Sequence, residues 1–159
     1  MLTFNTLYED YAPDVYRFAL WLSGSSFWAE DITSETFIRA WSKRNTIRTE
    51  TLKAYLFAIA RNSYLERRRK QKNPSVLNSS LFDPSPGPEK TIELQADLRQ
   101  IQEVLMTLSE IDRTTFVLKV QHDLPYDEIC RILDLNMSAA RVKVHRVRKK
   151  IMQNFLEKE

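Results

Sequence analysis

The C-terminal part of this sequence concentrates positive charge in a stretch that also has helical apolar spacing. Ten residues there hold six cations and no acid: Arg141, Lys143, Arg146, Arg148, Lys149 and Lys150. Apolar side chains recur at steps of three and four through the same stretch: Val144, Val147, Ile151 and Phe155. This pattern predicts an amphipathic helix with a cationic outer face. Arginines on such a face can bind phosphates or guanine edges in a major groove, and the simplest alternative is a solvated basic surface.

The context of this stretch favours nucleic-acid binding over a plain basic surface. Directly before it lie a short segment of helical apolar spacing, which starts at Leu124, and a break at residues 134–137. A short helix, a tight turn and a longer helix form a helix-turn-helix unit. In that arrangement six polar side chains lie on the outer face of the second helix and become DNA-binding candidates: Ser138, Arg141, Lys143, His145, Arg148 and Lys149.

A second cationic cluster lies in the stretch RNSYLERRRKQKNPSV, residues 61–76. After Arg61, it places five more cations beside a single acid, Glu66: Arg67, Arg68, Arg69, Lys70 and Lys72. Cations suit the negative end of a helix, but that effect is about 0.3 to 1 kcal/mol per charge and does not call for five of them. Binding to about five phosphates would instead give a steep salt dependence. Helix-end electrostatics and phosphate binding both stay open from the charges alone.

Three acids, Glu30, Asp31 and Glu35, lie near the start of an expected second helix. They allow three interpretations: helix-end electrostatics, a partner-binding face, or a carboxylate site for a metal or for catalysis. The last is the least favoured because no histidine lies nearby; the chain contains only His122 and His145. The sequence also lacks a glycine-rich phosphate loop, a nucleophile elbow and an HExxH motif. It therefore predicts no enzyme activity, no cofactor and no metal site.

Composition narrows the class of protein further. Hydrophobic residues make up 43% of the chain, which is ample for a buried core, and the formal charge is only +3, so local clusters must carry any nucleic-acid binding. The single cysteine excludes an internal disulfide. No stretch approaches the roughly 18 apolar residues of a membrane span, and charges interrupt the N-terminal segment. We expect a cytoplasmic protein without direct membrane insertion.

Prolines and glycines divide the chain. Only two glycines occur, and four of the six prolines fall between residues 73 and 90. Because both residue types disfavour helices, this segment predicts a flexible Pro/Ser-rich linker between two small domains, residues 1–72 and 91–159. Elsewhere the apolar spacing is helical, with expected helices in the first domain near 7–22, 27–43 and from 52 onward. The expected fold is all-α, with the helix-turn-helix in the second domain.

Capping residues mark several expected helix boundaries. The sequence SGSS at 23–26 supplies a glycine to end the first helix and serines to cap the second. Thr49 or Thr51 can cap the third helix. After the linker, Ser109 with Asp112 three residues on predicts another helix start, and Pro125 suits a first-turn position.

Three motifs together resemble a known family. AEDITSETFIRAW (29–41), LKAYLFAIARNSYLERRRKQ (52–71) and LPYDEICRILDLNMSAARVKVHRVRKKI (124–151) are similar to the extracytoplasmic-function (ECF) sigma factors of bacterial RNA polymerase. The similarity covers both expected domains, in the order of the family and with its linker position. It implies a subunit without catalysis of its own, which binds core RNA polymerase, directs it to specific promoters and assists promoter melting.

The resemblance implies separate tasks for the two domains. The acidic-aromatic helix would bind the clamp helices of the largest polymerase subunit, through Asp31, Glu35, Phe37 and Arg39. The loop at 43–51 and the following helix would capture an unstacked base of the minus-ten promoter element and hold the opened strand, through Asn45, Arg48, Arg61, Asn62, Arg67, Arg68 and Arg69. Tyr55 and Tyr64 would offer stacking surfaces for that base.

The second domain would place Ser138 to Lys149 in the major groove of the minus-thirty-five element. The family also implies an anti-sigma factor, often membrane-bound, that covers both domains.

The sequence departs from the family pattern at four places. Ser34 replaces a usual glutamine of the polymerase-binding motif, and Ser109 stands where proline is frequent, although Arg113 matches. The helix-turn-helix turn reads Asp134, Leu135, Asn136 without the usual glycine, and Asn136 remains a good cap. Ala139 and Ala140 replace a usual threonine and valine, so the family pattern does not specify the promoter sequence.

Two other functions remain as alternatives from the residues. A stand-alone helix-turn-helix regulator would bind duplex DNA tightly without polymerase. A metal-dependent nuclease using Glu30, Asp31 and Glu35 would cleave DNA when magnesium or manganese is added.

Overall fold

The computed structural model describes residues 2–46, 52–71 and 92–157. The chain divides into two compact units, Met1–Ser79 and Ser80–Glu159, and each is described by itself. Regular structure in the described residues is helical, without a strand, which confirms the predicted all-α fold. The linker predicted at 73–90 and the capping candidates Thr49 and Thr51 lie outside the described residues.

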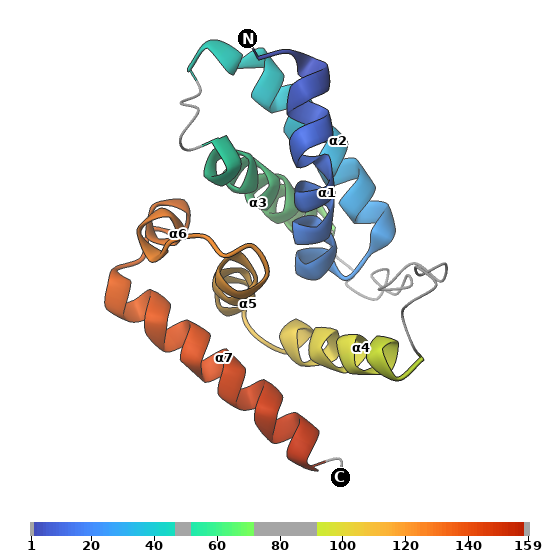
Figure 1. Ribbon diagram of the computed structural model, residues 1–159, viewed down its shortest axis with the longest axis vertical. Coiled ribbons are helices and arrows are strands. Elements are labelled where there is room, and N and C mark those ends of the chain that lie inside the picture. Colours follow the sequence, from blue (N-terminus) through green and yellow to red (C-terminus); the bar gives the residue numbers. More distant parts are fainter. Residues whose placement is uncertain (1, 47–51, 72–91, 158–159) are drawn as a thin grey trace. The chain divides into compact units, whose positions relative to one another are not determined.

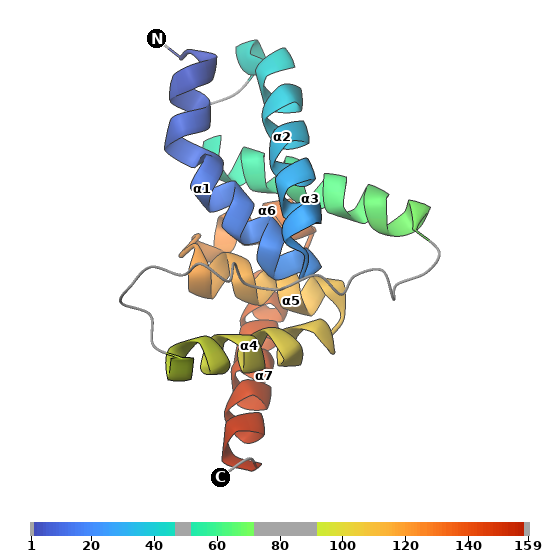
Figure 2. The same cartoon turned by 90° about the vertical axis from the view of Figure 1, so that its right-hand side faces the viewer.

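The described residues of unit 1 form three α-helices and one short turn of 3₁₀-helix. These are α1 (Phe4–Ser23), α2 (Ser26–Ser42), η1 (Arg44–Thr46) and α3 (Leu52–Lys70). Helices α1 and α2 lie side by side and α3 crosses both (Figure 2). Their boundaries follow local signals: Gly24 takes a left-handed conformation and donates its N–H to the carbonyl of Leu20, and the Ser25 side chain accepts from the N–H of Trp28.

The core of unit 1 is built from the apolar stripes of its three helices. Leu7, Leu22, Ile32 and Leu56 are fully buried, and the rings of Phe18 and Phe57 pack with centroids 4.8 Å apart. Burying one such side chain contributes about 1.5 to 3 kcal/mol, so this packing fixes which faces of α2 and α3 remain exposed.

Unit 2 is organised around its last and longest helix. It contains α4 (Ile92–Met106), α5 (Glu110–Phe116), the π-helical turn η4 (Val117–Gln121), α6 (Tyr126–Leu133) and α7 (Met137–Glu157). Helix α7 contacts α4, α5 and α6 (Figure 1), and its buried side chains are Ala140, Val144 and Val147. Ser109 caps α5 as predicted, because its side chain accepts from the N–H of Asp112.

A buried cation joins α4 to α5. Arg113 is only 3% exposed, and its guanidinium donates to the carbonyls of Leu105 and Leu108, where α4 ends. The Leu105 carbonyl also accepts from the N–H of Leu108, so Arg113 adds a second donor there and serves the carbonyl of Leu108, just beyond the end of α4. This cation is part of the fold of unit 2.

The turn between α6 and α7 forms without glycine. Asp134 adopts the left-handed conformation, with φ 54° and ψ 53°, and the N–H groups of Asp134 and Leu135 both donate to the carbonyl of Cys130. Asp tolerates this conformation better than most residues. The Asn136 side chain then accepts from the N–H of Ala139 and caps α7, as predicted. The helix-turn-helix is therefore confirmed, and Pro125 serves as the cap residue before α6.

Candidate binding surfaces for polymerase and DNA

The outer face of α7 is cationic. Five of the six residues predicted for this face are exposed: Ser138, Arg141, His145, Arg148 and Lys149. The guanidinium carbon of Arg141 lies 5.3 Å from the centre of the Tyr126 ring, and Lys119 Nζ lies 4.6 Å from the same ring. Cation–π contacts of this kind restrain a long side chain while leaving its donors accessible.

Lys143 does not belong to this outer face. Its side chain is 20% exposed, and its Nζ lies 2.9 Å from an oxygen of Asp112, whose side chain is 15% exposed. Position 143 is next to the buried Val144 and faces α5, so the lysine ties α7 to α5. The structure thus corrects the prediction that Lys143 faces outward.

Val142 and Arg146 are also exposed on α7, although the predicted DNA-binding set did not include them. They lie one and two helical turns beyond Ser138, and this spacing of four residues was the signal that could have found them. A shallow hollow of about 360 Å³ lies at this place and is lined by Asn136, Ser138, Ala139, Val142, Lys143 and Arg146.

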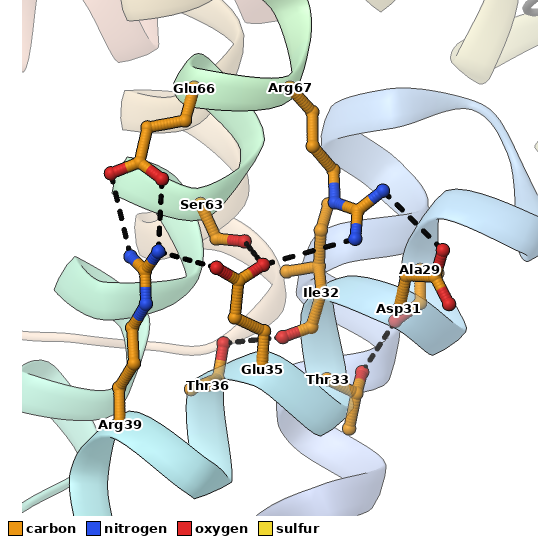
Figure 3. Close-up of polar contacts among 10 residues, drawn as sticks. All are labelled: Ala29, Asp31, Ile32, Thr33, Glu35, Thr36, Arg39, Ser63, Glu66 and Arg67. Carbon is orange, nitrogen blue, oxygen red and sulfur yellow. Dashed lines mark hydrogen bonds and ion pairs between the residues drawn. The ribbon is translucent and has the colours of Figure 1, made fainter.

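In unit 1 the acids of α2 form a network with α3, which Figure 3 shows. Arg67 reaches from α3 toward two carboxylates, with Nη1 3.4 Å from Asp31 and Nη2 3.8 Å from Glu35. Ser63 donates its hydroxyl to Glu35 at 2.8 Å, and Glu35 also forms an ion pair with Arg39 on its own helix.

Arg39 in turn binds Glu66 of α3 with both guanidinium nitrogens. The two N–O distances are 3.0 and 3.5 Å. The hydrogen bond to Glu66 raises the pKa of Arg39, and the hydrogen bond from Arg39 lowers the pKa of the Glu66 carboxyl. Both groups are therefore held in their charged forms, and α2 is joined to α3 by alternating charges.

The residues predicted to bind polymerase are only partly on one surface. Asp31, Glu35 and Arg39 lie together and are partly exposed. Phe37 is 1% exposed, and its ring lies 5.1 Å from that of Tyr8, so it packs inside unit 1 and presents no surface to a partner. Two large apolar side chains that the sequence analysis missed, Phe27 and Ile38, are instead about two-thirds exposed on α2.

Those two residues share a helix face with the acids. Positions 27, 31, 34 and 38 recur at steps of three and four, which places Phe27, Asp31, Ser34 and Ile38 along one line of α2. This spacing was the signal available in the sequence. Exposed apolar side chains bordered by polar residues are typical of a protein-binding site.

The network also bears on the other interpretations of the acids. Helix α2 begins at Ser26, so Glu30 and Asp31 lie beyond its first turn, where the effect of the helix dipole is small. In the part of the chain that the structure describes, no group of His, Cys, Asp and Glu could hold a metal ion.

The residues predicted for the minus-ten element have different surroundings. Asn45 in η1 and Asn62 in α3 are exposed, as are Arg68 and Arg69, whereas Arg61 is half-buried. Arg48 lies outside the described residues. Next to Asn45, the guanidinium of Arg44 lies 4.3 Å from the Trp41 ring, a cation that the sequence analysis missed.

The stacking surfaces expected for an unpaired base are also unequal. Tyr55 is half-buried, but Tyr64 is 2% exposed and packs against Trp28, with ring centroids 6.0 Å apart. Tyr64 therefore belongs to the core of unit 1, and its predicted stacking role is corrected.

Comparisons with known proteins agree with this architecture. Residues 7–73 match the family model of sigma-70 region 2, and residues 98–151 match that of sigma-70 region 4. Together the two matches cover most of the chain, and they fall on unit 1 and unit 2 respectively. They define the class of the protein as a two-domain sigma-70 factor.

Similar proteins narrow the class to one group. The ECF RNA polymerase sigma factor SigM of Bacillus subtilis is 28% identical over 158 residues, which cover 94% of this chain and 93% of SigM. SigE of Mycolicibacterium smegmatis is 32% identical over 167 residues, covering 99% of this chain and 63% of SigE. The sigma factor RpoE of Bartonella quintana, solved with the anti-sigma factor NepR, has the same fold, with a TM-score of 0.78, 24% identity and 96% coverage of both chains.

The chain belongs to the ECF sigma factors of the sigma-70 family. As such it directs RNA polymerase to promoters, and sigma factors are transcription initiation factors, not enzymes. Among the described residues, no helix has the length and apolar character needed to cross a membrane.

Proposed function

We propose that this sigma factor binds core RNA polymerase and the minus-ten element through unit 1 and the minus-thirty-five element through unit 2. The observation that carries this division is the placement of charge. Partly exposed acids lie on α2 of unit 1, and a cationic face lies on α7 of unit 2. The two surfaces suit partners of opposite charge, a cationic protein face and the phosphates of a duplex.

The polymerase contact uses the line of α2 that contains Asp31 and Ser34. Asp31 and Glu35 would pair with cations of the clamp helices of the largest subunit, and Phe27 and Ile38 would bury apolar surface beside them. Arg39 takes part through its pairs with Glu35 and Glu66. Phe37 contributes by packing α2 against the core of unit 1, and it does not contact polymerase.

The minus-ten contact uses η1, which follows α2, and the exposed side of α3. Asn45 and Asn62 offer amide groups to the edges of an unpaired base, and Arg61 lies beside Asn62 on α3. Arg68 and Arg69, exposed at the end of α3, would bind phosphates of the opened strand. Arg48 is included among these minus-ten contacts on the basis of the sequence alone.

The minus-thirty-five contact uses the exposed face of α7. Ser138 and Arg141, near the start of the helix, would reach base edges, because the first residues of a recognition helix enter the major groove. His145, Arg148 and Lys149 would bind the backbone. Lys143 holds α7 against α5 and supports this face from behind.

The cellular setting follows from the family. The protein acts in the cytoplasm, where polymerase and promoter DNA are found, and an anti-sigma factor holds it inactive by covering the binding faces of both units. An anti-sigma factor anchored in a membrane would place this sigma factor near that membrane without inserting it.

Reconstitution with cognate core polymerase tests the function. The full chain should bind core enzyme and give promoter-dependent transcripts from a genomic promoter library, and it should bind duplex DNA weakly without polymerase. Tight duplex binding without polymerase, together with no transcript from the library, would instead support a stand-alone regulator.

The polymerase surface has its own test. Reversing both acids, Asp31→Lys with Glu35→Lys, should lower polymerase affinity at least 100-fold, because two attractive pairs become repulsive. The matched control is Asp10→Lys with Glu9→Lys, which reverses two exposed acids of α1. Equal loss in both variants would refute the assignment to α2.

A further inference from the structure

An exposed apolar side chain interrupts the cationic face of α7. Val142 is 50% exposed, and it lies between Ser138 one turn before it and Arg146 one turn after it, both exposed. Packing does not explain the residue, because the core contacts of this helix are made by Ala140, Val144 and Val147. Helix propensity does not explain it either, because valine is a poorer helix former than lysine or arginine.

The surroundings of Val142 form a small recess with mixed chemistry. It lines the hollow of about 360 Å³ together with Ala139, and the remaining lining residues are polar. Lys143, which also lines the recess, has its Nζ 2.9 Å from Asp112. The recess therefore offers an apolar patch beside a cationic residue, Arg146.

We infer that Val142 recognises the methyl group of a thymine in the minus-thirty-five element; this inference rests on the proposed role of α7. The 5-methyl group of thymine is the apolar group that base edges present in the major groove. Val142 is the sixth residue of α7, in the part of a recognition helix that approaches base edges. Val142 thereby makes one promoter position specific for thymine.

Replacing thymine by uracil isolates this contact, because uracil differs from thymine only by the missing methyl. Duplex promoters randomised over the upstream element are prepared once with thymine and once with deoxyuridine. Each pool is bound by polymerase reconstituted with the full-length chain. For the wild type, one position should prefer thymine and lose about fourfold in affinity when the methyl is absent.

Two substitutions at the same position sharpen the test. Val142→Ala should bind the thymine and uracil pools equally, because the partner of the methyl is gone. Val142→Thr keeps one methyl and the branched shape, and should retain the discrimination. Met152→Ala, which removes an exposed apolar side chain near the other end of α7, is the matched control and should behave as the wild type.

The outcomes separate this inference from the function on which it rests. The wild type could give transcripts and yet bind the thymine and deoxyuridine promoters with equal affinity. That result would overturn the role of Val142 and leave the sigma-factor function intact. Retained discrimination in Val142→Ala would overturn it as well. Failure of polymerase binding with every pool would refute the proposed function itself.

A second inference concerns Arg67 and is carried by the α2–α3 network. Its guanidinium lies 3.4 and 3.8 Å from Asp31 and Glu35, longer than the 2.7 to 2.9 Å typical of a charge-assisted hydrogen bond. Its Nε is buried and has no hydrogen-bond partner in the part of the chain that is described. Arg67 is therefore held near the acids without being well satisfied by them (Figure 3).

We propose that Arg67 competes with polymerase for Asp31 and Glu35 and becomes available to the promoter when polymerase displaces it. The proposal rests on the assignment of these acids to polymerase binding. Partly exposed ion pairs are weak, about 0 to 1 kcal/mol, so a cationic partner can exchange with Arg67 at little cost. The exchange couples polymerase binding to promoter binding. When polymerase displaces Arg67, its cations pair with Asp31 and Glu35, and Arg67 becomes free to bind a phosphate of the promoter.

Substitution of Arg67 should therefore have opposite effects on the two partners. Arg67→Met should raise polymerase affinity up to about fivefold, by removing the competitor, and should lower promoter affinity of the assembled enzyme. Arg68→Met is the matched control, because Arg68 is exposed on the same helix end. It should lower promoter affinity alone.

Polymerase affinity measured by competition between labelled and unlabelled chain decides the matter. Unchanged or weaker polymerase binding of Arg67→Met, at an unchanged melting temperature, would overturn the exchange. If methionine lowers the melting temperature, Arg67→Lys serves instead, because it keeps the charge but cannot span both acids, and it too must bind polymerase more tightly. Loss of polymerase binding in the wild type as well would refute the proposed function.

Discussion

The two cationic runs of this protein look alike in sequence but differ in what faces them. At the end of α3, the first arginine of the run lies against two acids of the neighbouring helix, and the next two are exposed. On α7 most of the cations are exposed, and Lys143 is instead paired with an acid, Asp112 of α5. The comparison shows that a cation is available to DNA when no acid of an adjacent helix pairs with it. The density of charge in the sequence does not decide this.

Arg113 is a cation that is buried and fully committed to the fold, so its substitution has the largest expected effect on stability. Arg113→Ala should destabilise unit 2 by about 3 kcal/mol, because the Leu108 carbonyl loses its side-chain donor, the Leu105 carbonyl loses one of its two donors, and a buried side chain is removed. Urea unfolding followed by circular dichroism measures the loss. The tryptophans, Trp21, Trp28 and Trp41, all lie in unit 1, so an unchanged fluorescence transition is the internal control.

The exposed cation Arg148 is the matched contrast to Arg113. Arg148→Ala should change stability by less than about 0.5 kcal/mol. If the two substitutions destabilised unit 2 equally, the distinction between structural and binding cations would fail.

Arg141 should have the next largest effect, on DNA binding. Arg141→Ala should cost about 1 to 3 kcal/mol of promoter affinity and relax sequence preference at one position if the arginine pairs with a base edge. Selection from a randomised promoter pool measures both quantities. A uniform loss across sequences would assign Arg141 to the backbone.

Lys143 should behave unlike its exposed neighbours on α7. Lys143→Met should leave the salt dependence of promoter binding unchanged and destabilise unit 2 by about 1 kcal/mol, because the ion pair with Asp112 is lost while the aliphatic stem is kept. Lys149→Met, at an exposed position, should instead lower the log–log salt slope by about 1. A lower slope in Lys143→Met would return that lysine to the DNA-binding face.

The pair of Glu66 and Arg39 gives the smallest expected effect, and it depends on pH. The pKa of Glu66 is lowered in the folded protein, so its pair stabilises unit 1 above the usual value of 4.5 and loses that contribution as pH falls below it. Tryptophan fluorescence in urea should therefore show Glu66→Gln less stable than the wild type at pH 7, with the difference vanishing in acid. A difference that persisted below the folded pKa would show that the charge of Glu66 is not the cause.

Local signals in the sequence were sufficient for the framework of the fold. Glycine at 24, serines at 25 and 109 and Asn136 each act on their own helix end, and all were predicted correctly. Membership of the family and the helix-turn-helix were predicted for the same reason, because their motifs are contiguous. The five exposed residues of α7 followed from the apolar line opposite them.

The errors concern contacts between helices. Phe37 lies next to Thr36 in the apolar stripe of α2, and Tyr64 continues the line of Leu56 and Ala60, so a wider stripe would have placed both inside. The partners of Lys143 and Arg67 come from residues 31 or more positions away, and no spacing within one helix reveals them. Site prediction therefore fails where a charged side chain meets a second helix.

The π-helical turn at the end of α5 has a consequence for comparing this chain with its relatives. In η4 the N–H of His122 donates to the carbonyl of Val117, five residues back, so this stretch accommodates one residue more than an α-helix would over the same course. Each residue of an α-helix advances about 100° around the axis. A relative with one residue fewer between 117 and 121 can continue as plain α-helix and still deliver α6 in the same direction. A single-residue gap in an alignment at this point is therefore structurally silent, whereas the same gap within α7 would rotate every DNA-facing side chain after it.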